Sequence, residues 1–180
     1  MTSASGYYAY QDLVQTYSVG DLRYIPNQPY RYHKDSVAGY LESTGDFTIL
    51  LFLLRTAKMD VIVDQQQFRS TLFACPDSML RMRFEDEFFM NLDRGSIMKL
   101  INVHILPRMV DEPTLRSKKL SILQTKDDYS KLTFINNGET MPLLVNGADN
   151  GIECHIVSPT IVRNNGVIYI IDDLLLPENF

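Results

Sequence analysis

The chain has 180 residues, an apolar share of 45% and a formal net charge of −5 at pH 7. This length can bury a substantial core within one domain. The acidic balance excludes a general nucleic-acid-binding protein, which needs a basic face to displace the counterions of the phosphates. A local basic cluster, Arg116, Lys118 and Lys119, is interpreted as a solvated loop because no aromatic residues are interleaved with it.

The N-terminal sequence lacks the basic start and apolar run of a signal peptide. The most apolar segment, residues 47–54, ends at Arg55 and is too short to span a bilayer. We therefore expect no transmembrane segment and an intracellular or virion location. Two cysteines, Cys75 and Cys154, are too few for a disulfide framework or a metal box, although pairing between them stays open.

Residues 1–40 are rich in tyrosine and show neither a helical nor an alternating pattern. We expect an extended arm that has no core of its own and contacts neighbouring proteins through tyrosine rings with polar tips. Fully extended, such an arm reaches roughly 130 Å. An arm that folds back on its own domain is the alternative. The predicted partner-binding residues are Tyr7, Tyr8, Tyr10, Tyr17, Tyr24, Tyr30 and Tyr32.

A globular pattern begins at residue 41, and residues 41–180 are expected to form one domain. A buried helix is predicted over residues 47–59, with Asp46 as its N-cap. After a short strand over residues 69–74, a second helix is predicted over residues 78–90, with Asp77 as its N-cap. A third helix, residues 95–106, is expected to end before Pro107.

Beyond Lys131 the pattern becomes that of short strands separated by turns. The Asn-Gly pairs at 137–138, 146–147 and 165–166 are typical of hairpin turns with positive φ angles. Helices followed by antiparallel strands predict an α+β fold with helices against one side of a sheet. The predicted strands cover residues 131–135, 140–145, 151–157, 159–162 and 167–171.

Two sequence boxes carry a resemblance to a known family. The first runs from Thr71 to Leu80 and reads TLFACPDSML; the second runs from Asn165 to Pro177 and reads NGVIYIIDDLLLP. Together with the VHILP segment at residues 103–107 and the VNGA turn at residues 145–148, they make residues 45–177 resemble a fasciclin-like domain. The resemblance implies a β-wedge of antiparallel strands with several helices packed against it.

The fold-defining residues that the resemblance implies come from these boxes. They are Thr71, Phe73, Ala74, Asp77, His104, Asn165, Gly166, Ile168, Asp172, Leu175 and Pro177. Two positions depart from the family pattern, because Cys75 stands where proline is usual and Val103 replaces the tyrosine of a Tyr-His pair that the family links to integrin binding.

The sequence contains no recognisable catalytic or metal-binding set. His104 is interpreted as a buried, hydrogen-bonded structural residue. Asp172 and Asp173 are adjacent in an extended segment, so their side chains point to opposite faces and do not form a carboxylate pair. By the same geometry, Cys154 and His155 do not share one metal. We therefore expect no enzyme activity, no catalytic residues, no metal and no cofactor.

The sequence favours a non-enzymatic structural or interaction protein. We expect the fasciclin-like domain to dock in a larger assembly, such as a minor capsid protein does in a large virus, with the N-terminal arm tethering neighbouring subunits. Two alternatives stay open. One is an adhesion module that binds a receptor or glycan, and the other is a carrier of apolar small ligands.

Overall fold

A computed structural model describes residues 32–126, 130–138, 144–146, 154–177 and 180. Seven α-helices and eight strands lie in these ranges, and they confirm the predicted α+β class. The helices are α2 (Val37–Thr44), α3 (Thr48–Thr56), α4 (Asp60–Asp64), α5 (Asp77–Leu80), α6 (Asp86–Met90), α7 (Arg94–Val103) and α8 (Glu112–Arg116), and a 3-10 turn, η2, spans Gln66–Phe68. The strands are β1 (Ser70–Ala74), β2 (Ile105–Leu106), β3 (Leu120–Gln124), β4 (Lys131–Ile135), β5 (Leu144–Asn146), β6 (Cys154–His155), β7 (Ile161–Arg163) and β8 (Gly166–Ile170).

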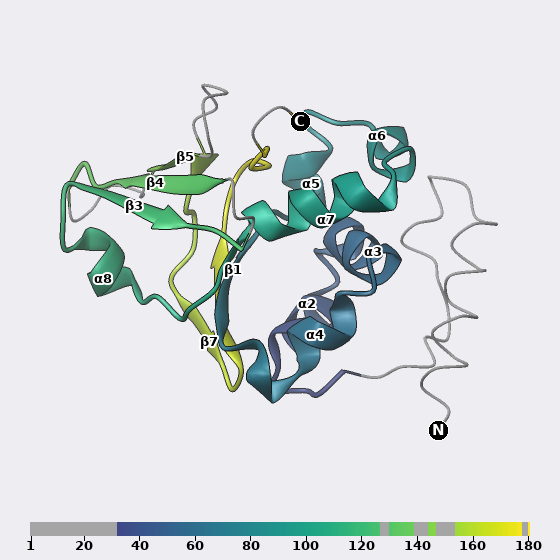
Figure 1. Cartoon of the computed structure of the whole chain (residues 1–180), viewed down its shortest axis with the longest axis horizontal. Coiled ribbons are helices and arrows are strands. Elements are labelled where there is room, and N and C mark those ends of the chain that lie inside the picture. The colour runs from purple at the N-terminus through teal and green to yellow at the C-terminus, as the bar shows by residue number, and fades with distance from the viewer. Residues whose placement is uncertain (1–31, 127–129, 139–143, 147–153, 178–179) are drawn as a thin grey trace.

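The strands form two four-stranded sheets, in the orders β2-β1-β8-β7 and β3-β4-β5-β6. All the strand pairs are antiparallel except β1 and β8, which pair in parallel from Ser70↔Gly166 to Ala74↔Ile170. In Figure 1 the helices α2, α3 and α4 lie on one side of β1, and α8 and β3 lie on the other. The order of the strands along the chain does not predict this parallel pair. Through it, the first family box lies beside the second.

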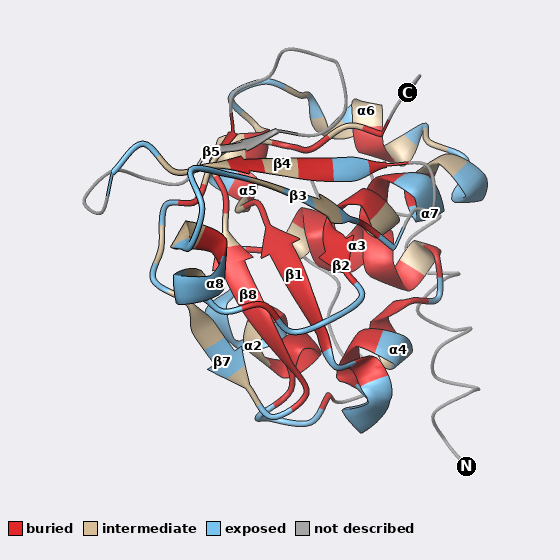
Figure 2. Ribbon diagram, turned by 60° about the vertical axis from the view of Figure 1, so that its left-hand side comes forward, coloured by how far each residue is buried: buried red, intermediate tan, exposed pale blue. Residues whose placement is uncertain are grey.

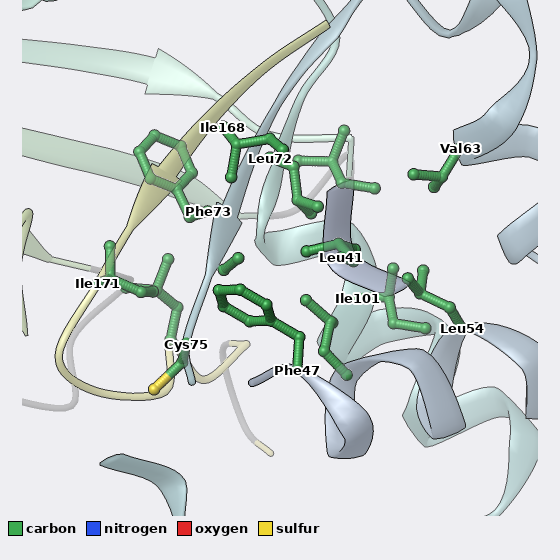
Figure 3. Packing of buried hydrophobic residues seen from close by; sticks show 14 of the residues in the cluster. Leu41, Phe47, Leu54, Val63, Leu72, Phe73, Cys75, Ile101, Ile168 and Ile171 are labelled. Carbon is green, nitrogen blue, oxygen red and sulfur yellow. The ribbon is translucent and has the colours of Figure 1, made fainter. Parts of the chain in front are cut away.

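The core fills the space between these layers. Helix α3 is buried from Ile49 to Arg55, as its apolar sequence predicts, and strands β1 and β8 are buried over most of their length (Figure 2). In Figure 3, Leu72 of β1 lies between Ile168 of β8 and the helix residue Leu41. Burial of such apolar side chains, each contributing roughly 1.5–3 kcal/mol, is the main stabilising contribution.

An aromatic stack connects the two sheets. The ring of Phe73 on β1 stacks on Tyr169 of β8, with the centroids 5.6 Å apart. The ring of Phe134, on β4 of the second sheet, also contacts Phe73, with the centroids 5.6 Å apart. All three side chains are fully buried. The second sheet therefore contacts the first through a buried aromatic cluster.

Several local predictions differ from the structure. The helix predicted over residues 78–90 is divided into α5 and α6, and the helix predicted over residues 95–106 ends at Val103, where the chain enters β2. The sequence patterns also miss α8 and β3. β3 is only half covered, with exposed side chains alternating with partly buried ones, and its first residues follow a run of lysines that resembles a loop.

The turn between β7 and β8 lacks the positive φ angles that its Asn-Gly pair predicts. Arg163 pairs with Gly166, so Asn164 and Asn165 are its central residues. Among the described residues other than glycine, only Lys58 and Arg69 have a positive φ angle, and Gly166 has none. Gly166 is required by space instead, because a Cβ atom there would lie 2.7 Å from the carbonyl oxygen of Ser70.

The predicted boundary at residue 40 falls inside α2. Val37, Ala38 and Leu41 of this helix are fully buried in the core of the domain. Residues 1–31 of the predicted arm lie outside the described residues.

Within the described ranges, no helix combines the length and apolar character that crossing a bilayer requires. In the same ranges, no three His, Cys, Asp or Glu side chains gather in an arrangement that could hold a metal ion.

Candidate interaction site

The described chain begins with a buried polar attachment to α3 and α4, formed by Tyr32, His33 and Ser36, which we term the N-terminal root. The Tyr32 hydroxyl donates a hydrogen bond to Asp60 Oδ2 at 2.7 Å and accepts one from Arg55 Nε at 2.7 Å. The Arg55 guanidinium also lies 5.2 Å from the centre of the Tyr32 ring. Burial and the nearby Asp60 carboxylate raise the pKa of Tyr32 against the opposing effect of Arg55, so the hydroxyl keeps its proton.

Tyr32 therefore corrects one prediction. The sequence places it among the partner-binding tyrosines, but its exposed fraction is 8% and its hydroxyl is used within the domain. Its ring is held there because Arg55 and Asp60 are themselves buried, and burying charges is favourable only when they are paired and hydrogen-bonded. The other predicted partner-binding tyrosines, from Tyr7 to Tyr30, lie outside the described residues.

Asp64 holds the next part of the root. Its side chain is fully buried, and its carboxylate accepts hydrogen bonds from the His33 backbone N–H at 2.8 Å and the Ser36 hydroxyl at 2.5 Å. The His33 ring nitrogen Nδ1 lies 2.8 Å from the other carboxylate oxygen. Ser36 also caps α2, since its hydroxyl accepts from the Gly39 N–H. The chain is thus fixed to α4 immediately before it enters α2.

Asn165 joins the root to the second family box. Its Oδ1 accepts from the Val37 N–H at 2.8 Å, and its Nδ2 donates to the carbonyl oxygens of Val63 and Gln65 at 2.8 and 2.9 Å. The residue is fully buried. One amide therefore connects the β7–β8 turn, the start of α2 and the end of α4.

Asp77 has a different role from the predicted one. It is the first residue of α5, whose N-cap is Pro76, and its carboxylate caps α3 instead. It accepts from the backbone N–H groups of Thr48 and Ile49 at 3.1 and 2.9 Å, and from the Thr48 hydroxyl at 2.5 Å. Asp46, the predicted cap, is exposed. A carboxylate at this helix start satisfies free N–H groups and interacts favourably with the helix dipole.

His104 follows α7 and is buried with both ring nitrogens occupied. Nδ1 lies 2.7 Å from the Leu100 carbonyl oxygen and donates to it, while Nε2 accepts from the Leu175 N–H at 3.1 Å. Burial lowers the pKa of His104 to about 4. The neutral ring holds the C-terminal segment of the second box against α7. Val103 beside it is also fully buried, so this His and its neighbour are not presented to a partner.

The remaining motif residues lie on or beside the parallel pair. The Thr71 hydroxyl donates to the Arg108 carbonyl oxygen and accepts from the Val110 N–H, and Asp172 accepts from the backbone N–H and ring Nδ1 of His155 at 2.7 and 3.0 Å. Phe73, Ala74, Ile168, Leu175 and Pro177 are buried. The motif residues thus join distant segments of the domain through contacts within the domain.

The root itself had a partial signal in the sequence. Ser36 directly precedes the apolar positions Val37, Ala38 and Leu41, a pattern that marks a helix N-terminus. No local pattern marks Tyr32, Asp60 or Asp64, because each depends on a partner far away in the chain.

The fold and these contacts define a class of protein. It is an α+β module in which two β-sheets and a helical layer are joined through a parallel strand pair and buried polar connections. A model of the fasciclin domain matches residues 45–177, and the chain belongs to this family.

A solved structure supports the same fold. This structure, a pair of FAS1 domains from the insect cell adhesion molecule fasciclin I, matches with a TM-score of 0.55 and 18% sequence identity over 71% of this chain. The match covers 45% of that chain, so the present sequence spans less than half of the domain pair. Among curated proteins, none matches this sequence.

Proposed function

We propose that this protein is a non-enzymatic interaction module that docks in a larger assembly and contacts neighbouring subunits through residues 1–31. Membership of the fasciclin family supports the general role, since these domains typically serve adhesion and interaction. An intracellular or virion setting, including that of a minor capsid protein, is the specific form of the proposal that follows from the sequence.

The observation that carries the proposal is the N-terminal root. A segment that tethers neighbours transmits load to its own domain only if its base is fixed. Here Asp60 and Asp64 bind the N-terminal root, and these two residues are 1% and 0% exposed. Charge-assisted hydrogen bonds of this kind are about twice as strong as neutral ones. The root therefore suits a chain that is pulled from its N-terminal side.

Deletion of residues 1–31 tests the proposal, and the end point of the deletion matters. Removing residues 1–40 would also remove the buried residues Val37 and Ala38 and unfold the core. A tagged full chain and a tagged chain lacking residues 1–31 are expressed in the cells that make the protein, and the extracted complexes are compared by size and composition. The full chain is expected to elute with other subunits and the shortened chain alone, with an unchanged thermal midpoint. Equal incorporation of both chains contradicts the proposal.

A receptor- or glycan-binding adhesion module is the second candidate. It is favoured by the structural match to domains of an insect cell adhesion molecule. This candidate predicts that the protein occurs outside intact cells and that binding to a receptor or glycan survives deletion of residues 1–31. Surface labelling of intact cells and glycan-array binding of both chains separate it from the first proposal.

The described core gives little support to an apolar ligand carrier. A pocket lined by Leu53, Phe73, Leu100 and His104, among others, has a volume of about 20 Å³. This is space for about one water molecule and far below that needed for a drug-sized ligand.

A further inference from the structure

The strand β3 forms one wall of a groove that the family motifs do not involve. The groove has a volume of about 380 Å³ and lies between α8 and β3. Thr114 and Leu115 of α8 and Ser117, which follows that helix, line one side, and residues 120–123 of β3 line the other. Arg108 and Lys118 complete the lining. We term this feature the edge groove.

β3 is the first strand of its sheet, and within the described ranges no strand pairs with its outer edge. The Asn136 N–H donates to the Lys119 carbonyl oxygen at 2.9 Å, and Leu120 pairs with Ile135. In an antiparallel ladder, residues alternate between facing the partner strand and facing away from it. The backbone groups of Leu120 and Ile122 therefore point away from β4, toward the open edge.

Two of the three exposed side chains of β3 are apolar. Leu120 and Ile122 are 52% and 58% exposed, although neighbouring strand residues are partly covered. An open strand edge with exposed apolar side chains is the surface to which an extended segment adds as a further strand, with main-chain hydrogen bonds giving affinity and alternate side chains giving specificity.

The charge of the edge groove selects among occupants. Its lining contains two cations, Arg108 and Lys118, and no carboxylate. Glu112, in the first turn of α8, is already paired with Arg116 at 2.7 Å. Two basic β3 edges repel each other, so a symmetric edge-to-edge dimer is disfavoured. Residues 1–22 of the chain carry Asp12 and Asp21 and no Lys or Arg, and they contain tyrosine and valine, which favour strands.

We propose that the edge groove binds residues 1–22 of a second copy of this chain as an added strand. This inference rests on the proposed function, in which residues 1–31 contact neighbours, and it names the neighbour and the receiving surface. A second copy is favoured because the root fixes the chain to α4, across β1 from α8 and β3 (Figure 1), so residues 1–22 would have to pass around the domain to reach the edge groove of their own chain. Thirty-one extended residues reach roughly 100 Å, enough to span to another domain. Such a contact is head-to-tail and propagates from copy to copy.

Sedimentation velocity of the full chain at concentrations from about 1 to 300 μM tests the proposal. We expect the wild-type chain to form dimers and larger species within this concentration range, with the share of larger species rising with concentration. Ile122→Glu, which places a carboxylate opposite the acidic segment, is expected to weaken association at least tenfold. Ile122→Pro removes the outward N–H together with the Ile122 side chain, breaks no hydrogen bond to β4, and is expected to weaken association similarly. The matched control is Val162→Glu on the edge strand β7, where Val162 is 66% exposed, and association should not change.

Three outcomes overturn the inference. They are a chain that stays monomeric at 300 μM, association that Ile122→Glu leaves unchanged, and association that survives deletion of residues 1–31. A monomer in which hydrogen exchange shows protection of β3 that depends on residues 1–31 means docking within one chain and rejects the second copy. Since the proposed function is tested by co-purification with other subunits, a monomeric chain that still requires residues 1–31 for incorporation rejects this inference alone.

Discussion

The carboxylate of Asp77 caps α3, a helix that starts 29 residues earlier in the chain, by accepting the N–H of Ile49 at 2.9 Å. The first family box thus contributes the start of α5 and the cap of α3 with one residue. Asp77 itself is 7% exposed, so its charge is stabilised mainly by these donors and by Arg81, whose guanidinium lies 3.9 Å away.

Replacing Asp77 tests this long-range cap. Asp77→Ala is expected to lower the free energy of unfolding by about 2 kcal/mol, because loss of a helix cap costs roughly 0.5–2 kcal/mol and three donors lose one acceptor. Urea denaturation followed by circular dichroism measures it. The matched control is Asp46→Ala, at the exposed residue that the sequence favours as the cap, with an expected change below about 0.5 kcal/mol. A larger loss at Asp46 than at Asp77 contradicts the assignment.

Asn165 provides a second test of a buried connection. Asn165→Asp keeps the oxygen that accepts from Val37 N–H but replaces two donated hydrogen bonds with a carboxylate facing the Val63 and Gln65 carbonyl oxygens. We expect a loss of roughly 3 kcal/mol or more. The neighbouring Asn164 is exposed in the same turn, and Asn164→Asp should change stability by less than about 0.5 kcal/mol. Equal effects of the two variants, measured by thermal unfolding, are incompatible with the Asn165 contacts.

The N-terminal root predicts a specific effect of one hydroxyl group. Tyr32→Phe keeps the ring but removes the hydrogen bonds to Asp60 and Arg55, which are both buried. The expected loss is about 1–3 kcal/mol. Tyr40→Phe is the control, since the half-buried Tyr40 keeps its ring contact with Arg163. Hydrogen exchange should increase at α2 and α4 in Tyr32→Phe only, and unchanged exchange there would falsify the role of the root.

His104 predicts how stability depends on pH. Its pKa is about 4 when folded because of burial, and 6.5 is its ordinary value. The unfolded chain therefore binds more protons between these values, so the free energy of unfolding falls as pH drops from 6.5 to 4, by roughly 3 kcal/mol, and this contribution is constant outside that window. The protonated ring can no longer accept from the Leu175 N–H. In His104→Gln the free energy of unfolding should differ less between pH 6.5 and pH 4, by that amount, because the other titrating groups are unchanged. Identical pH profiles of the wild-type chain and the variant would exclude this role.

The two cysteines are expected to be unreactive in the folded protein. Both thiols are free and buried, and burial raises their pKa, that of Cys154 to about 12. At pH 8 the reaction with a thiol reagent should be at least ~100-fold slower than for an exposed cysteine and should accelerate on unfolding in denaturant. Met82→Cys supplies an exposed comparison, because Met82 is 80% exposed. Fast labelling of native Cys75 or Cys154 would show that the ends of β1 and β6 open readily.

The sequence determined the elements that have a strong pattern of their own. The apolar run of α3, the alternation of β4 and the two boxes around β1 and β8 predict those elements and the α+β class, because side-chain periodicity records which face is buried. The fasciclin domain model matches residues 45–177, which include both boxes. Weak patterns fail for a physical reason. Strand β3 is an edge strand that exposes the apolar side chains of Leu120 and Ile122 and directly follows two lysines, so its own pattern does not show which face is covered.

Only the tertiary structure decided which residues meet. Tyr32 is buried because Arg55 and Asp60 meet it from 23 and 28 residues away. The cap of α3 is Asp77 and not the adjacent Asp46, and Gly166 is required by the approach of Ser70 on the parallel strand. A local pattern shows how a side chain is oriented along its own helix or strand. Its hydrogen-bond partners depend on how distant segments pack, and the packing of the whole core sets that arrangement.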